Sequence, residues 1–90
     1  MTYFSDETLN HNLKSVEDDI NIIISNKDIV IRKHYLHFVH NQCFNNVITY
    51  RFQYKDWYIA SLKTKIMKLR QYLSINEINE FSIDYIIDTL

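Results

Sequence analysis

The pattern of apolar positions predicts a long first helix. Its core-facing stripe, with steps of three and four, consists of Leu9, Leu13, Val16, Ile20 and Ile23. Ser5 or Asp6 can cap the first amides, and acidic residues in the first turn suit the helix dipole. The spacing therefore predicts a helix over residues 6–25.

A second helix is expected after the polar turn at residues 25–28, where Asp28 can act as the N-cap. From residue 29 to about 43, the expected buried face consists of Ile31, Tyr35, Phe38 and Val39, with Lys33, His37 and His40 opposite. A β-hairpin is the alternative, because residues 22–24 and 29–31 are β-branched runs on either side of the turn. The periodicity beyond the turn on both sides favours two helices.

Residues 47–55 fit two patterns. As a strand, Ile48, Tyr50, Phe52 and Tyr54 alternate with polar residues. As a helix, the segment begins one long stripe that continues to residue 73 and consists of Ile48, Phe52, Ile59, Leu62, Ile66, Leu69 and Leu73. We favour the helix, and residues 56–73 are helical in both interpretations.

Ser74 and Glu77 have the spacing of a capping box, which predicts the start of a last helix over residues 75–88. Its expected apolar members are Ile75, Ile78, Ile83, Ile86 and Ile87. The complete pattern predicts one all-α domain over residues 1–90, a small antiparallel four-helix bundle. An α+β fold with a strand at about 47–55 is the alternative.

Composition narrows the classes of function. The chain has no glycine and no proline, which excludes a P-loop or a Rossmann turn. This absence has two equal explanations: a preference for helices, or an AT-rich gene such as a phage or viral one. The single cysteine, Cys43, leaves no intramolecular disulfide and suits a cytoplasmic protein. Residues 1–10 lack the features of a signal peptide, and the longest apolar runs are too short to cross a bilayer.

Charge is segregated along the chain, although the formal net charge is only −1. Residues 1–28 and 74–90 are mainly acidic, whereas nearly all bases lie in between. We predict that the acidic ends pair with the basic centre inside a compact bundle.

No catalytic or metal-binding constellation is expected. His34, His37, His40 and Cys43 are spaced by three, which spreads them around a helix and does not gather them on one zinc ion. Arg32 and His37 form an Arg-x4-His pattern that resembles the short motif of HEPN-class RNases, in which Arg and His meet across a dimer cleft to cut RNA. The resemblance covers six residues, and Lys33 stands where that family usually has a small polar residue. We predict no enzyme, no metal and no cofactor.

The aromatic cluster at residues 50–58 is the strongest functional signal. On a helix, Tyr50, Tyr54 and Trp57 would lie opposite the core stripe, and such a second apolar face needs a partner. We therefore expect a protein-binding module, of the immunity, antitoxin or inhibitor type, that masks a toxin or host factor. Acidic residues expected to steer the partner are Asp18, Asp19, Glu77 and Glu80.

Two other functions are the alternatives. A nucleic-acid-binding protein would use the basic stretch of Arg51, Lys55, Lys63, Lys65, Lys68 and Arg70. A structural homodimer of viral or phage origin would bury the same aromatic face against a second copy.

Overall fold

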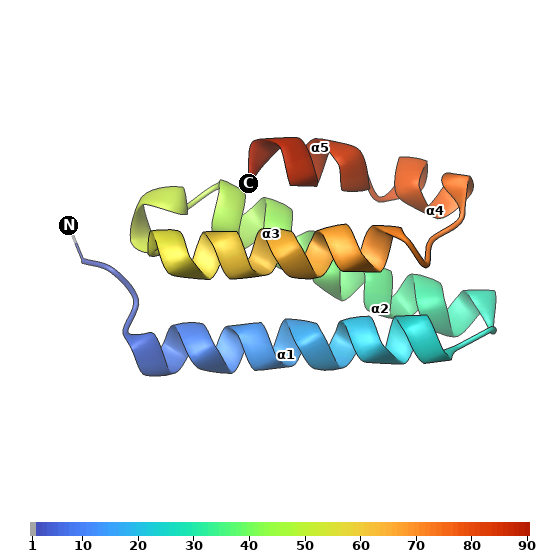
Figure 1. Cartoon of the computed structure of the whole chain (residues 1–90), viewed down its shortest axis with the longest axis horizontal. Coiled ribbons are helices and arrows are strands. Elements are labelled where there is room, and N and C mark those ends of the chain that lie inside the picture. The colour runs from blue at the N-terminus through green and yellow to red at the C-terminus, as the bar shows by residue number, and fades with distance from the viewer. Residues whose placement is uncertain (1) are drawn as a thin grey trace.

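Helices form most of the chain in a computed structural model, which describes residues 2–90 (Figure 1). In chain order the elements are α1 (Asp6–Ser25), α2 (Ile29–Asn41), the π-helical turn η1 (Gln42–Ile48), the 3-10 turn η2 (Arg51–Gln53), α3 (Asp56–Arg70), α4 (Ile75–Glu80) and α5 (Ile83–Thr89). Met1, the first residue of the domain predicted over residues 1–90, lies outside the described residues.

The helices run alternately in opposite directions along a bundle of 41 × 22 × 18 Å. α1 and α3 lead away from the end that holds the N-terminus, and α2 and the pair α4–α5 lead back to it (Figure 1). α1 packs against α2 and α3, and α5 packs against α3 and η1. The predicted all-α bundle is confirmed. The alternative with a strand at residues 47–55 is wrong, because residues 2–90 contain no strand.

α1 follows the sequence prediction in its bounds and in its buried face. All five members of the predicted stripe are buried. The Ser5 hydroxyl accepts a hydrogen bond from the backbone N–H of Thr8 and so caps the first turn.

α2 begins as predicted, because the Asp28 carboxylate accepts a hydrogen bond of 2.9 Å from the backbone N–H of Val30. Its buried stripe differs from the predicted one and runs on through η1: Leu36, Val39, Cys43 and Val47. Ile31 and Phe38, which we expected in the core, are exposed. The buried face is rotated because Leu36, which the expected stripe omitted, points at the centre of the bundle.

A continuous helix over residues 47–73 is a wrong prediction. The helical backbone ends near Thr49, and η2 makes one tight turn. Tyr54 is extended, and α3 begins after Lys55, which has no side-chain capping hydrogen bond. The reversal has a physical cause, because α3 buries its stripe only by running back beside α1. Backbone contact secures the turn: the N–H of Phe4 donates a 3.0 Å hydrogen bond to the carbonyl of Gln53.

The predicted capping box is present at the start of α4. Ser74 accepts from the backbone N–H of Glu77, and the Glu77 carboxylate accepts from the backbone N–H of Ser74. The single last helix over residues 75–88 is corrected to two, because Ser82 adopts left-handed backbone angles with φ of 51°. Ile75, expected on the apolar face, is 75% exposed.

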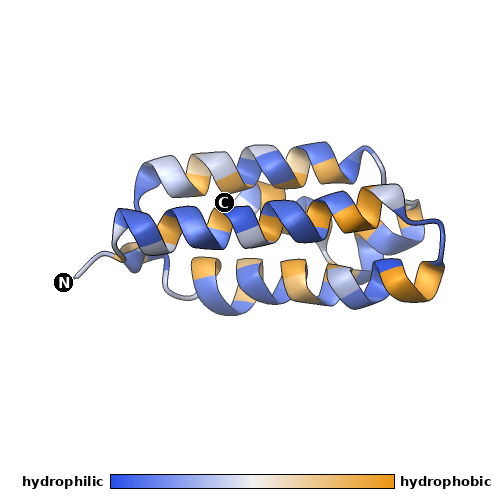
Figure 2. Ribbon diagram, turned by 90° about the horizontal axis from the view of Figure 1, so that it is seen from below, coloured by the Kyte–Doolittle hydropathy of each residue, from blue (hydrophilic) through white to orange (hydrophobic). Residues whose placement is uncertain are grey.

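The core is apolar throughout the described residues. Figure 2 shows that hydrophobic and hydrophilic residues alternate along each helix, as expected for helices with one buried face. Residues 2–90 contain no buried charged side chain, and each buried side-chain nitrogen or oxygen there has a hydrogen-bond partner. None of the helices in this part of the chain is both long and apolar enough to span a membrane.

Candidate protein-binding surfaces

Four aromatic side chains are exposed at the end of the bundle that holds the N-terminus. We name them the aromatic end surface: Tyr3 is 58% exposed, Tyr50 47%, Phe52 50% and Trp57 42%. They come from the chain before α1, from the turn between η1 and α3, and from the first turn of α3. The side chains of Tyr3 and Phe52 also line a hollow of about 500 Å³, with Arg51 and Asp56 among its polar lining residues.

The aromatic end surface is built on two buried tyrosines. The Tyr54 ring lies 5.0 Å from the ring of Phe4 and 5.0 Å from that of Tyr58, measured between centroids. The Tyr58 hydroxyl accepts a 3.2 Å hydrogen bond from the side-chain amide of Gln42. Burial raises the pKa of the Tyr58 hydroxyl to about 12, so this group stays neutral. Of the exposed rings, Trp57 lies edge-on to Tyr58 with 6.4 Å between centroids. Tyr3 and Phe52 line the same hollow as Tyr54.

Two aromatic residues have exchanged the places that the sequence predicted. Tyr54, expected to be exposed and to bind a partner, is buried. Phe52, expected in the core stripe, is exposed. The prediction assumed helical geometry across residues 47–55, whereas the extended backbone at Tyr54 turns its ring inward. Tyr50 and Trp57 are exposed as expected.

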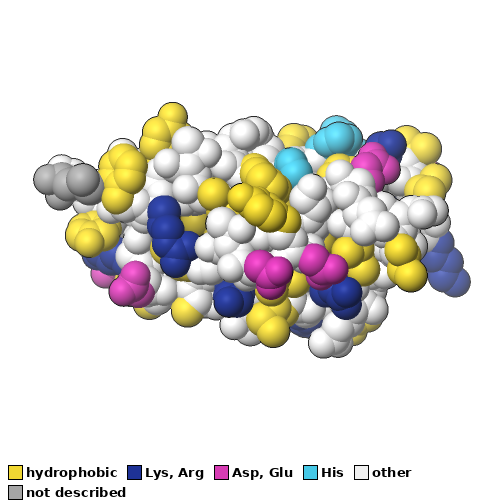
Figure 3. Space-filling model, turned by 90° about the horizontal axis from the view of Figure 1, so that it is seen from above, with side chains coloured by type: hydrophobic (Ala, Val, Ile, Leu, Met, Phe, Trp, Pro, Cys, Tyr) yellow, Lys and Arg dark blue, Asp and Glu magenta, His cyan; other side chains and the backbone are white. Residues whose placement is uncertain are grey.

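A second apolar area lies at the opposite end, where the α1–α2 and α3–α4 connections meet. We name it the aliphatic end surface, and its members are Ile29, Val30 and Ile75. Figure 3 shows hydrophobic side chains at both ends of the bundle and others along the face between them. We did not predict this area, although residues 29–31 form an uninterrupted apolar run directly after an N-cap, where a helix has no earlier turn to cover them.

The four predicted acidic partner residues fall into two groups. Glu77 pairs with Arg32 at 3.0 Å, and Glu80 pairs with Lys33 at 2.8 Å, so both already have a cation within the chain. Asp18 pairs with Lys14 one helical turn away at 3.0 Å, in an exposed position. Asp19 has no ion pair among residues 2–90. Of the four predicted acids, only Asp19 on α1 therefore lacks a cation within residues 2–90.

The basic residues of the nucleic-acid alternative are mostly occupied as well. Lys55 pairs with Asp6, Lys65 with Glu17, and Arg70 with Asp84. Arg51 donates hydrogen bonds of 3.0 Å to the carbonyls of Thr89 and Leu90 at the end of α5. Lys63 and Lys68 remain without an ion pair among residues 2–90. Five of the six ion pairs join the basic centre to an acidic end, which confirms the predicted pairing.

Arg32 holds together the end of the bundle that lies beside the aliphatic end surface. Its guanidinium donates to the carbonyls of Ile23, Asn26 and Tyr72 and twice to the carboxylate of Glu77. A guanidinium has five N–H groups, and all five are used here. Arg32 therefore has a structural role, and the resemblance to the HEPN motif does not extend to an arginine free to contact RNA.

The histidines and Cys43 are spread around the helical segment, as their spacing by three predicts. The ring of His37 contacts that of Phe81 edge-on, and His40 stacks on Phe44 at 4.5 Å while its Nδ1 lies 2.9 Å from the carbonyl oxygen of Phe81. Cys43 is buried, and burial raises the pKa of its thiol to about 12. In residues 2–90 no three His, Cys, Asp or Glu side chains are grouped closely enough to hold a metal ion.

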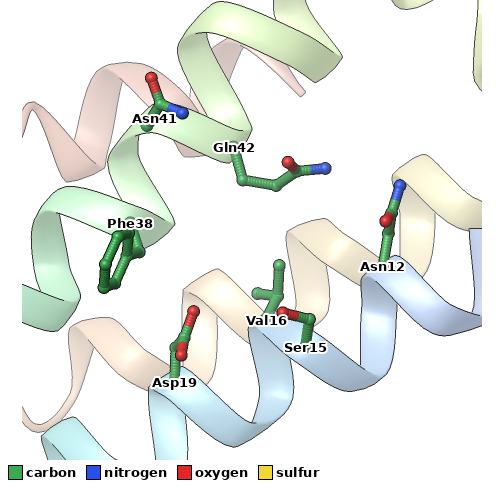
Figure 4. A pocket seen from close by; sticks show the side chains of 7 residues that line it. All are labelled: Asn12, Ser15, Val16, Asp19, Phe38, Asn41 and Gln42. Atoms are coloured by element: carbon green, nitrogen blue, oxygen red, sulfur yellow. The ribbon is translucent and has the colours of Figure 1, made fainter.

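A polar groove separates α1 from the junction of α2 and η1 (Figure 4). It has a volume of about 360 Å³ and is lined by Asn12, Ser15, Val16, Asp19, Phe38, Asn41 and Gln42. Asp19 on α1 and Phe38 on α2 point toward one another across it (Figure 4). The groove therefore brings one of the predicted acidic residues next to an exposed aromatic ring.

Comparison with known proteins gives no relative on which to base a function. No protein-family model, no curated protein and no solved structure matches this chain. The surfaces of the molecule are therefore the basis for a functional proposal.

Proposed function

We propose that this protein acts by binding another protein through the aromatic end surface. The observation that carries the proposal is the exposure of Tyr3, Tyr50, Phe52 and Trp57 at one end of a bundle whose buried side chains are otherwise well packed. Aromatic side chains contribute large contact areas with few rotatable bonds and are frequent among residues that dominate binding energy.

The base under these rings favours tight binding. Trp57 packs edge-on against the buried Tyr58, and Tyr3 and Phe52 share a hollow with the buried Tyr54. Gln42 of η1 holds Tyr58 through a hydrogen bond. A surface held in this way loses little conformational entropy when a partner binds. The partner that fits best has an apolar pocket for aromatic rings.

The charges on α1 favour a partner with a basic area. Glu77 and Glu80 have partners within the chain, whereas Asp19 has none among residues 2–90, and Asp18 has only an exposed one. Exposed pairs contribute little and exchange easily. A basic partner would be steered toward this side of the bundle before the aromatic contacts form.

We further propose that the protein masks the site of its partner, as a small immunity protein, antitoxin or inhibitor does. A compact and rigid end with half-exposed rings suits the covering of a preformed cleft. A nucleic-acid function is less well supported, because only Lys63 and Lys68 of the six proposed bases lack a contact that occupies them within residues 2–90.

The experiment uses the wild type and two matched double variants as baits and compares the proteins that each bait captures. Phe52→Ala with Trp57→Ala removes rings from the aromatic end surface, and Val30→Ala with Ile75→Ala removes apolar side chains that are more exposed still, at the opposite end. We expect a protein that wild type and the second variant retain and the first variant loses. The activity of that protein, measured with and without the chain, then tests inhibition.

Equal capture by all three forms would refute the aromatic end surface as the binding site. A homodimer in light scattering that Phe52→Ala with Trp57→Ala converts to a monomer would replace the proposal by the homodimer alternative. The comparison is made only with variants that keep the helical circular dichroism spectrum of the wild type.

A further inference from the structure

The groove between α1 and α2 contains polar groups that the fold does not use. Asn12, Ser15 and Asp19 lie at successive turns of one face of α1 and line it. Their side chains make no hydrogen bond to another described residue, whereas Asn41 and Gln42 across the groove are held by Asn45 and Asn46. Side-chain acceptors on α1 therefore face a wall in which the amide oxygens of Asn41 and Gln42 already accept hydrogen bonds.

Asp19 is set apart from the other acids of the chain. It is half-buried, and among residues 2–90 it has neither an ion pair nor a capping role. Burial, and then the charge of the neighbouring Asp18, raise the pKa of its carboxyl above the ordinary 3.8. An ionised carboxylate in this position is poorly compensated, and a cation placed beside it would stabilise it.

The opposite wall offers an aromatic ring. Phe38 is exposed and points toward Asp19 across the groove (Figure 4). Cations bind over aromatic faces, and a guanidinium does so more often than an ammonium because it is planar and weakly hydrated. Val16 lines the groove as well and supplies an apolar contact for a methylene stem.

The ligand that satisfies these groups is a donor-only, planar cation. A guanidinium has five N–H donors and no acceptor, and it pairs with a carboxylate through two parallel hydrogen bonds. Asp19 supplies that carboxylate, and Ser15 and Asn12 supply further oxygen acceptors within one and two turns of α1. A volume of about 360 Å³ suffices for one such side chain.

We propose that this groove binds an arginine side chain of the partner protein. The proposal rests on the proposed function, because it takes the ligand to be part of a protein, and it names the chemistry of the partner at a second contact. Asp19 pairs with the guanidinium, Phe38 stacks on it, and Ser15, one helical turn from Asp19, accepts a further N–H group.

The test uses a blocked arginine, N-acetyl-arginine-N-methylamide, and needs no partner. Its titration into the isotope-labelled full chain is followed by nuclear magnetic resonance. We expect saturable shifts at the groove residues, and none with the citrulline analogue, which has the same shape without the charge. Asp19→Asn should weaken the affinity by at least about tenfold, because a charge-assisted hydrogen bond is lost.

Glu7→Gln is the matched control, because Glu7 is an exposed acid on α1 outside the groove. It should bind the blocked arginine like wild type. Shifts spread evenly over all carboxylates, equal affinity of Asp19→Asn and wild type, or no saturable shift would each overturn the arginine site. The aromatic end surface would be unaffected by such a result, since its own test is capture by the double variants.

Discussion

Arg32 and Glu77 are joined by two hydrogen bonds of 3.0 Å across 45 positions of the sequence. Their side chains are only 14% and 13% exposed, so the pair is largely shielded from water. The same guanidinium reaches carbonyls at the end of α1 and before α4. One side chain thus connects the start of the bundle with its last third.

Arg32→Ala is expected to lower the free energy of unfolding by about 3 kcal/mol, because it leaves the shielded Glu77 carboxylate and several carbonyls without a donor. Urea denaturation measures the loss. Lys33→Ala is the control, since Lys33 pairs with Glu80 in an exposed position, and its loss should stay below about 1 kcal/mol. Equal losses in the two variants would contradict a special role of Arg32.

The Arg32–Glu77 pair also predicts a pH dependence. Hydrogen bonds from Arg32, opposed by burial and aided by the backbone N–H of Ser74, hold the pKa of Glu77 below the ordinary 4.5. The ionised carboxylate therefore stabilises the fold above that pH, and this contribution is lost as the pH falls through the lowered pKa. Wild type should exceed Glu77→Gln in stability at pH 7, and the difference should shrink in acid. A constant difference across the acid titration would contradict the pairing.

Ser82 should gain stability from replacement by glycine. Its φ of 51° lies in the left-handed region, which costs a non-glycine residue about 1 kcal/mol. Ser82→Gly is expected to raise the free energy of unfolding by about 0.5 kcal/mol or more, and Ser82→Val to lower it. Thermal melts of both variants test the sign, and a stabilising valine would contradict the backbone assignment.

Phe52 and Tyr54 form a matched pair that separates surface from core. Tyr54→Ala removes a buried ring and should cost about 3–5 kcal/mol of stability. Phe52→Ala removes an exposed ring and should cost less than about 1 kcal/mol while weakening partner binding. Denaturation curves of the two variants suffice for the stability comparison. A larger loss for Phe52→Ala would mean that its ring belongs to the core.

Cys43 should report unfolding of the chain. It is buried in the described structure, and the high pKa of its thiol keeps the reactive thiolate scarce. We expect the native protein to react with a thiol reagent only at its rate of opening, and the unfolded protein to react at once. Fast labelling without denaturant would show that η1 opens locally.

The fold could be predicted from the sequence where the spacing of apolar residues and a capping residue indicate the same helix. α1 is the clearest case, with its stripe and its Ser5 cap, and the Ser74–Glu77 capping box is another. α2 was correct in position and partly wrong in its face, because Leu36 and Phe38 are both large and apolar although they lie on nearly opposite sides of the helix. Period alone does not decide which of them points inward.

The turn at residues 49–55 and the break at Ser82 lacked a local signal. With no glycine or proline in the chain, reversals are made by ordinary residues, and only tertiary packing decides where they occur. For the same reason, the exchange of Tyr54 and Phe52 between surface and core was beyond the sequence pattern. The groove at Asp19 was equally hidden, because it depends on how α1 and α2 diverge near η1.

Two helix ends in this protein are completed by arginine side chains in place of a terminal glycine. Arg32 binds carbonyls where α1 stops, and Arg51 binds those where α5 stops. A glycine cap can form within a short peptide, whereas Arg51 reaches α5 only after the chain has closed on itself. Fragments of this protein should therefore fray at these termini, and the final helix boundaries should appear in a single cooperative step with the assembled bundle.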